Sequence, residues 1–176
     1  MLNLLQGRVQ SMNYNEHFRL DNFKRYGLQC GLAGLAVLIL LLVLDAVTQT
    51  VLIASLGASA FIAFAVPRSL HSDPRHLVGG YLVGLISGVV MSLLESAVAT
   101  SGAWEHAVLV IFGALAISLA MFSMVVTRSE HPPAAALALG LVLNEWNLAT
   151  LFVILSGVIL LSVIKQIVLP MLMDLV

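Results

Sequence analysis

One histidine in the chain precedes two consecutive prolines, at His131-Pro132-Pro133, and a run of alanines follows from Ala134. Proline has no amide hydrogen, so paired prolines suit the first turn of a helix, where those donors would be unpaired anyway. Alanine has the highest helix propensity. The pattern predicts a helix that begins at Pro132 or Pro133, with the positive end of its dipole beside His131.

A second stretch of small and hydroxylated residues interrupts another short apolar segment, at Ser55-Leu56-Gly57-Ala58-Ser59-Ala60. If both stretches are helix starts that meet inside a membrane, the free amide groups of residues 57–59 and 134–135 would suit a small anion. The predicted substrate-binding residues are Ser55, Gly57, Ala58, Ser59, His131, Pro132, Pro133 and Ala134. The possible accessory residues are Thr127, Arg128, Ser129, Arg68 and Arg75. Alternatively, the small residues serve helix packing and the arginines only set membrane topology.

No catalytic pattern is present in the sequence. It contains no Ser-His-Asp set, no His-Glu-x-x-His metal motif and no phosphate-binding loop. The single cysteine, Cys30, cannot form an intrachain disulfide. We therefore expect a protein that is not an enzyme, with no catalytic residues, no bound metal and no cofactor.

The composition indicates which elements position these residues. Of the 176 residues, 60% are hydrophobic and only 10% are charged, whereas a soluble domain carries about 25% charged residues. The sequence therefore predicts an all-α integral membrane protein whose main partner is the lipid bilayer. The net charge of −1 does not indicate a nucleic-acid partner.

Six apolar segments are expected to be short transmembrane helices. They cover residues 28–44, 51–66, 77–99, 107–126, 132–143 and 148–172. A helix needs about 20 residues to cross a membrane, so the second segment is slightly short and the fifth is a half-helix, a re-entrant segment or part of a broken helix. We expect one transmembrane domain over residues 27–176, preceded by an amphipathic leader over residues 1–26 with apolar residues at helical spacing.

The positions of the basic residues predict the topology. With six crossings, every arginine and lysine falls on one side of the membrane, which must be the cytoplasmic side. Both termini are then cytoplasmic, and we expect a multi-pass protein of the bacterial inner membrane. The outer face would carry Asp45, Glu95, Glu105 and Glu145 without a basic residue. Such a face repels anions and suits a cation path or proton-coupled import instead.

The segments divide into two halves, residues 27–99 and 107–172, each with a short middle segment. Because three crossings is an odd number, a second copy of the unit would be inverted, as in inverted-repeat transporters. Small residues also recur every four positions along the third segment, at Gly80, Gly84, Gly88, Ser92 and Ser96. This stripe predicts close packing with another helix, either in the same subunit or in a second copy within a homo-oligomer.

Together, these motifs resemble the HPP family of membrane proteins, named for its His-Pro-Pro motif. The similarity rests on residues 130–136 and 55–60, and on Pro67-Arg68-Ser69 and Pro74-Arg75 leading to Gly79-Gly80. It spans about residues 27–172. The resemblance implies an integral membrane protein, with plant plastid members linked to nitrite transport and many bacterial members uncharacterised. Family descriptions count four transmembrane helices, fewer than the six expected here. Many relatives carry histidine after the paired glycines, where this chain has Tyr81.

The leading hypothesis is therefore a transporter or channel for a small inorganic anion such as nitrite, bound between two opposed helix starts near mid-membrane. The alternatives are a structural or assembly membrane protein without a pore, and a proton or cation channel.

Overall fold

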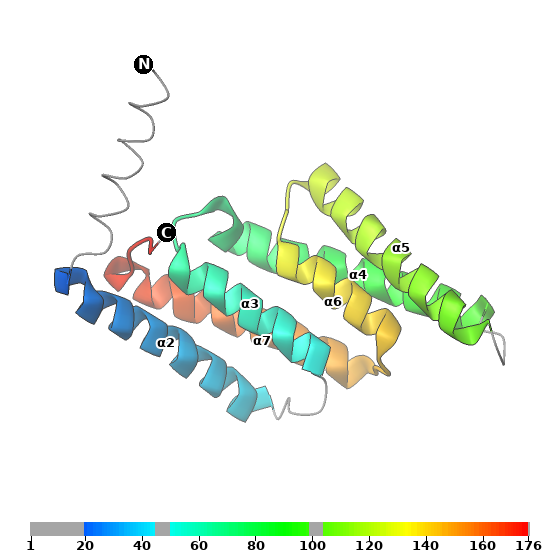
Figure 1. Ribbon diagram of the computed structural model, residues 1–176, viewed down its shortest axis with the longest axis horizontal. Helices are drawn as coiled ribbons and strands as arrows, with labels where there is room; N and C mark the ends of the chain where they lie inside the picture. The colour runs from blue at the N-terminus through cyan, green and yellow to red at the C-terminus, as the bar shows by residue number, and fades with distance from the viewer. Residues whose placement is uncertain (1–19, 45–49, 99–103, 176) are drawn as a thin grey trace, which may run out of the picture.

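The computed structural model describes residues 20–44, 50–98 and 104–175, and every regular element in these ranges is helical. In these ranges six α-helices follow one another, and two short 3-10 turns join or end them; Figure 1 shows their arrangement. The helices are α2 (Leu20–Leu44), α3 (Thr50–Ala65), α4 (Pro74–Val98), α5 (Glu105–Thr127), α6 (Pro132–Leu143) and α7 (Leu148–Val168); the turns are η1 (Leu70–Ser72) and η2 (Leu169–Met171). These helices confirm the six apolar segments and the all-α fold class.

Two boundaries differ from the sequence-based expectation. Helix α2 begins at Leu20, within the predicted leader, so the leader and the first segment do not divide at residue 27; residues 1–19 of the leader lie outside the described residues. Helix α3 runs without a break from Thr50 to Ala65. The prediction that Ser55 to Ala60 break the second segment is therefore wrong. A break would leave backbone amide and carbonyl groups without hydrogen bonds in an apolar environment. The free energy of that loss is larger than the low helix propensity of the single glycine, so the helix continues.

Helix length separates the long helices from the short ones. Three described segments are long and apolar enough to cross a membrane: Pro74–Val98, Glu105–Thr127 and Leu148–Met171. Helix α3 has 16 residues and α6 has 12, so α6 covers only about 18 Å at 1.5 Å per residue. The middle helix of each predicted half is therefore the shortest of its three.

Glycines recur at every fourth position of α4, at Gly80, Gly84 and Gly88, and α6 of the same chain packs against this stripe. A Cβ atom on Gly84 would lie 2.3 Å from the Ala134 carbonyl oxygen, and one on Gly88 would lie 2.9 Å from the Ala138 Cα. Residue numbers increase together along this contact, so α4 and α6 run parallel, side by side (Figure 1). Because glycine has no side chain, the two backbones approach closely over the length of α6.

The remaining helices enclose this pair. Helices α3 and α7 pack on one side of α4 and α6, α5 covers the other side, and α2 lies beyond α3 and α7 (Figure 1). The core consists mainly of small and aliphatic side chains, with Phe64 and Tyr81 the largest. At the far end of α4 the Trp146 indole donates a hydrogen bond to Ser92 Oγ over 2.9 Å, so this ring also fixes the segment that follows α6.

Candidate functional site

The connection between α5 and α6 enters the helix bundle before α6 begins. Arg128 ends α5 in the left-handed conformation, with φ 53° and ψ 50°, and His131 is the extended residue that precedes α6, with φ −142°. The connection lies against Gly79 and Gly80 of α4, where a Cβ atom on Gly80 would be 2.5 Å from the His131 Cβ. Glycine at position 80 therefore allows the histidine to reach the interior.

A chain of hydrogen bonds joins His131 to α3 and α4. Ser59 Oγ lies 2.8 Å from His131 Nε2 and 2.9 Å from Tyr81 Oη. The Tyr81 hydroxyl is also 3.3 Å from Ser55 Oγ, and the Ser59 hydroxyl is 3.0 Å from the Ser55 carbonyl. Tyr81 is 0% exposed and His131 is 1% exposed. Three helices thus converge on a fully buried polar chain, which we call the Ser59–Tyr81–His131 chain.

The other ring nitrogen of His131 fixes its tautomer. His131 Nδ1 lies 3.0 Å from the His71 carbonyl oxygen, which can only accept a hydrogen bond. Nδ1 therefore carries the hydrogen, and in the neutral ring Nε2 accepts a hydrogen bond from the Ser59 hydroxyl. If Nε2 were also protonated, it would donate to Ser59 Oγ, and the Ser59 hydroxyl could donate to the Ser55 carbonyl instead. The same atoms accommodate both charge states.

The surroundings favour the neutral state. Burial lowers the pKa of His131 to about 4, opposed by the hydrogen bond to the His71 carbonyl and assisted by the charges of His71 and His76. His131 is therefore uncharged at pH 7 and cannot attract an anion by a resident positive charge.

A second layer of ionisable groups lies around this connection. His71 Nδ1 is 2.9 Å from the Glu130 carbonyl oxygen, so the segments around His71 and His131 hold each other through two reciprocal hydrogen bonds. His76 is buried, and its Nε2 lies 3.6 Å from Glu130 Oε2 and its Nδ1 4.0 Å from Asp73 Oδ2. Among the described residues, no group of three or more His, Cys, Asp or Glu side chains could hold a metal ion.

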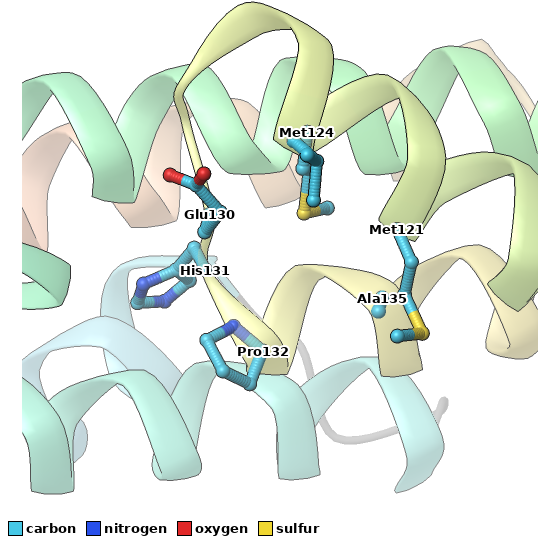
Figure 2. Close-up of a pocket in the computed structure, with 7 residues that line it drawn as sticks. Met121, Met124, Glu130, His131, Pro132 and Ala135 are labelled. Carbon is cyan, nitrogen blue, oxygen red and sulfur yellow. The ribbon is translucent and has the colours of Figure 1, made fainter.

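A cavity of about 310 Å³ lies between α5 and α6 on the other side of the connection. Figure 2 shows Glu130 and His131 on the connection and Pro132 at the start of α6 beside this cavity, with Met121 and Met124 on α5. Its lining residues are Met121, Met124, Val125, Glu130, His131, Pro132 and Ala135. His131 therefore lies between an apolar cavity and the buried polar chain.

The structure brings together only some of the predicted binding residues. Ser55, Ser59 and His131 meet in the chain of hydrogen bonds, Pro132 lines the cavity, and Pro133 and Ala134 are buried in the first turn of α6. Gly57 has no atom near its potential Cβ position, and Ala58 is exposed. These two residues lie in the helix interior and turn away from the site.

The proposed pair of opposed helix starts is wrong in its geometry. Residues 57–59 lie in the middle of α3, where amide groups bond to carbonyls of the preceding turn. At the start of α6 the two prolines have no amide hydrogen, and the Ala134 amide donates to the His131 carbonyl over 2.9 Å. The two stretches touch, as expected, but free backbone donors do not face one another across a gap.

The predicted accessory residues occupy the edge of this region. Ser129 is buried and its hydroxyl is 2.7 Å from Thr127 Oγ1. The side chains of Arg68, Arg75 and Arg128 are exposed. None of these residues has a described hydrogen bond to the Ser59–Tyr81–His131 chain.

Sequence reasoning missed several buried polar residues, among them Tyr81, His76 and Lys165. Tyr81 follows the paired glycines directly, and His76 lies four positions before Gly80 on the stripe that faces α6, so the stripe itself is a signal for the burial of His76. The sequence predicts that Lys165 lies on the basic side of the membrane, but its side chain is buried in the protein. No local pattern marks that burial.

The length and apolar surfaces of its helices define this chain as a helical, multi-pass integral membrane protein. The family model described as "HPP, transmembrane region" matches residues 21–173, and the chain therefore belongs to the HPP family. Two transmembrane proteins of Dictyostelium discoideum are similar to it: one is 42% identical over 96 residues, covering 54% of this chain and 31% of the relative. The other is 39% identical over 88 residues, covering 50% and 26%. The similarity thus covers less than a third of each relative's length. No solved structure matches the chain.

Proposed function

We propose that this protein is a transporter or channel for a small solute, and that the Ser59–Tyr81–His131 chain lies in the path of that solute. The observation that carries the proposal is the fully buried histidine hydrogen-bonded to Ser59 at the interior start of a short helix. Ionisable groups inside membrane helix bundles are costly and are found mainly on substrate and proton paths.

The pairing of the two short helices supports a transport function. Ser59 lies within α3 and His131 at the start of α6, the short middle helices of the halves 27–99 and 107–172, and Ser59 Oγ is 2.8 Å from His131 Nε2. Inverted-repeat transporters place their binding sites where such short or interrupted helices meet. In this proposal six helices cross the membrane, the halves form an inverted repeat, and both termini lie in the cytoplasm of a bacterial cell.

The proposed substrate is a small anion such as nitrite, as the family resemblance implies. His131 would take up a proton at Nε2 when the anion arrives, and the Ser59 hydroxyl would turn to the Ser55 carbonyl. The neutral ring would return when the anion leaves. One half of the molecule would rock against the other around this point. The protein would thus be a proton-coupled importer, not an enzyme.

Nitrite flux into liposomes tests the proposal. We expect vesicles that contain the protein to take up nitrite faster than empty vesicles, and uptake to accelerate when the outside is acidified. His131→Ala and His131→Gln should each reduce the flux about tenfold or more, because neither side chain can take up the proton. His106→Ala is the matched control, since His106 is exposed at the start of α5. Equal uptake in empty and protein-containing vesicles would refute nitrite transport.

A proton channel is the second candidate function, because the Ser59–Tyr81–His131 chain is a continuous set of hydrogen bonds able to exchange proton positions. In that case a pH gradient alone would collapse through the protein without nitrite, and His131→Gln would stop the collapse. An absence of both nitrite and proton flux would favour the remaining alternative of a structural membrane protein without a pore.

A further inference from the structure

Lys165 lies in the last turns of α7 and is almost fully buried. Its side chain is 3% exposed, and its ammonium group donates a hydrogen bond to the Ser72 carbonyl oxygen over 3.1 Å. A lysine that only marks the cytoplasmic side of a membrane extends its charge into water. The side chain of Lys165 turns into the protein instead.

No acidic side chain of the described residues pairs with this ammonium group. None of their carboxylates lies within 4.0 Å of Lys165 Nζ. Asp73 attracts it only from a longer distance, and the Asp73 side chain is 56% exposed. An ammonium group has three donors, and here one protein partner is present. A buried charge without a counter-charge is unfavourable, so an anion beside Lys165 Nζ would stabilise the ammonium group.

Two hydroxyl groups without partners lie in the turn that holds Lys165. The Oγ atoms of Ser69 and Ser72 are buried and have no hydrogen-bond partner among the described residues. Ser72 is 1% exposed, and its own carbonyl accepts the hydrogen bond from Lys165. Buried hydroxyls are nearly always hydrogen-bonded in proteins, so these two indicate a missing partner. A cation with two hydroxyl donors is the set that an oxyanion needs.

We propose that Lys165, Ser69 and Ser72 bind a small oxyanion at the end of the bundle where α7 ends and α4 begins. The identity of that anion as the transported one rests on the proposed function. The turn η1 connects this site to His131, because its successive carbonyls, of His71 and Ser72, accept hydrogen bonds from His131 and Lys165. Lys165 then supplies the positive charge that neutral His131 lacks, and the two residues divide charge recognition and proton uptake between them.

The test measures binding without transport. Purified protein in detergent is titrated with sodium nitrite at constant ionic strength, with gluconate as the replaced anion, and the unfolding temperature is recorded. We expect a rise of at least about 2 °C, because a ligand that binds only the folded state stabilises it. Lys165→Gln should abolish the rise. Arg25→Gln, which removes an exposed charge on α2, should retain it.

Further variants and ligands make the outcome decisive. If Lys165→Gln does not fold, the double variant Ser69→Ala/Ser72→Ala takes its place. This variant should fold because it retains the Lys165 ammonium group, and it should lose most of the rise in unfolding temperature because it lacks the two hydroxyl donors. The same rise in either variant as in the natural protein would overturn the proposal. A rise with phosphatidylglycerol but not with nitrite would also overturn it, because the site would then hold a lipid headgroup.

The two proposals fail separately. Nitrite-dependent stabilisation that needs Lys165, without any nitrite flux in liposomes, would refute the transport function and leave the oxyanion site standing. If the natural protein transports nitrite, and Lys165→Gln shows the same nitrite flux and the same nitrite-dependent rise in unfolding temperature, the transport function would be supported and this site refuted.

Discussion

The orientation of His131 follows from its two ring nitrogens. The His71 carbonyl holds the hydrogen on Nδ1, so Nε2 faces the Ser59 hydroxyl as an acceptor. The Tyr81 ring lies close by, with its centroid 5.6 Å from the His131 ring centroid. The imidazole is therefore fixed on two edges by hydrogen bonds and packed against an aromatic ring, which prepares one nitrogen for a change of protonation.

This arrangement predicts that acid destabilises the protein through His131. Burial lowers the pKa of His131 from 6.5 to about 4, so between these values the unfolded chain binds more protons than the folded protein. The stabilising contribution is complete above pH 6.5 and is lost as the pH falls to about 4, by at most roughly 3 kcal/mol.

Denaturant unfolding in detergent over this pH range checks the prediction. The free energy of unfolding of the natural protein should fall relative to that of His131→Gln, which has no titrating group at this position. A difference between the two proteins that stays constant from pH 6.5 to pH 4 would contradict the assignment of a neutral, buried His131.

The sequence identified His131 and Ser59 because their neighbours are unusual: paired prolines in one case, and clustered small residues in the other. It did not identify Lys165 or the burial of Tyr81. Basic residues near the end of an apolar segment are typical of topology signals, and only the position of η1 against α7 reveals that Lys165 points inward. Contacts between residues 93 positions apart leave no local pattern.

At the scale of helices, the position of α6 depends on its fit against α4. Its start lies beside Gly80, about 9 Å along α4 from Pro74 at 1.5 Å per residue. Glycines at 80, 84 and 88 let the α6 backbone approach, and the prolines begin the helix without unpaired amide groups inside the bundle. The absence of side chains at these glycines of α4 thus allows the short helix α6 to lie in the interior of the bundle.

Gly84→Ala should therefore destabilise the protein strongly. The new Cβ atom would lie 2.3 Å from the Ala134 carbonyl oxygen and 3.1 Å from its carbon, both of which are backbone atoms that cannot move alone. We expect a loss of about 1–3 kcal/mol, as for other overpacked interiors. Gly57→Ala is the control, since nothing lies within 4 Å of its potential Cβ position, and alanine should stabilise α3 by up to about 1 kcal/mol. Thermal unfolding in detergent measures both variants, and an equal stability of Gly84→Ala and Gly57→Ala would contradict the described packing.

Helix existence and length could be predicted well, whereas the internal structure of α3 could not. Hydrophobic runs bounded by charged or polar residues located all six helices, and the prolines located the start of α6 at its first residue. The small residues of α3 gave the wrong prediction of a break because Ser55 and Ser59 serve hydrogen bonding across helices. Serine and glycine in apolar helices are compatible with either function, and the three-dimensional contacts decide between them.

The whole molecule combines apolar outer surfaces with one end rich in ionisable residues. Large apolar side chains are exposed on both sides of the bundle, on α5 as at Phe122 and on α7 as at Phe152, where lipid would cover them. The exposed arginines Arg68, Arg75 and Arg128 all belong to connections or helix ends at the side where α3 and α5 end and α4 begins. The turn η1 lies at this same side, and its carbonyls accept hydrogen bonds from His131 and the buried Lys165.

The distribution of charge leads to a prediction about how α6 crosses the membrane. In a Cys30→Ser background, which removes the exposed free cysteine, single cysteines at Arg75, Glu105, Arg128 and Asn147 would all be exposed. With six crossings, a membrane-impermeant maleimide should label positions 75 and 128 only from the cytoplasmic side, and positions 105 and 147 only from the outside.

Positions 128 and 147 flank α6, which at about 18 Å is shorter than the roughly 30 Å hydrocarbon core. Its crossing therefore requires the α5–α6 connection to lie below the membrane surface. Labelling of position 147 from the same side as position 128 would make α6 a re-entrant helix and would exclude the inverted repeat.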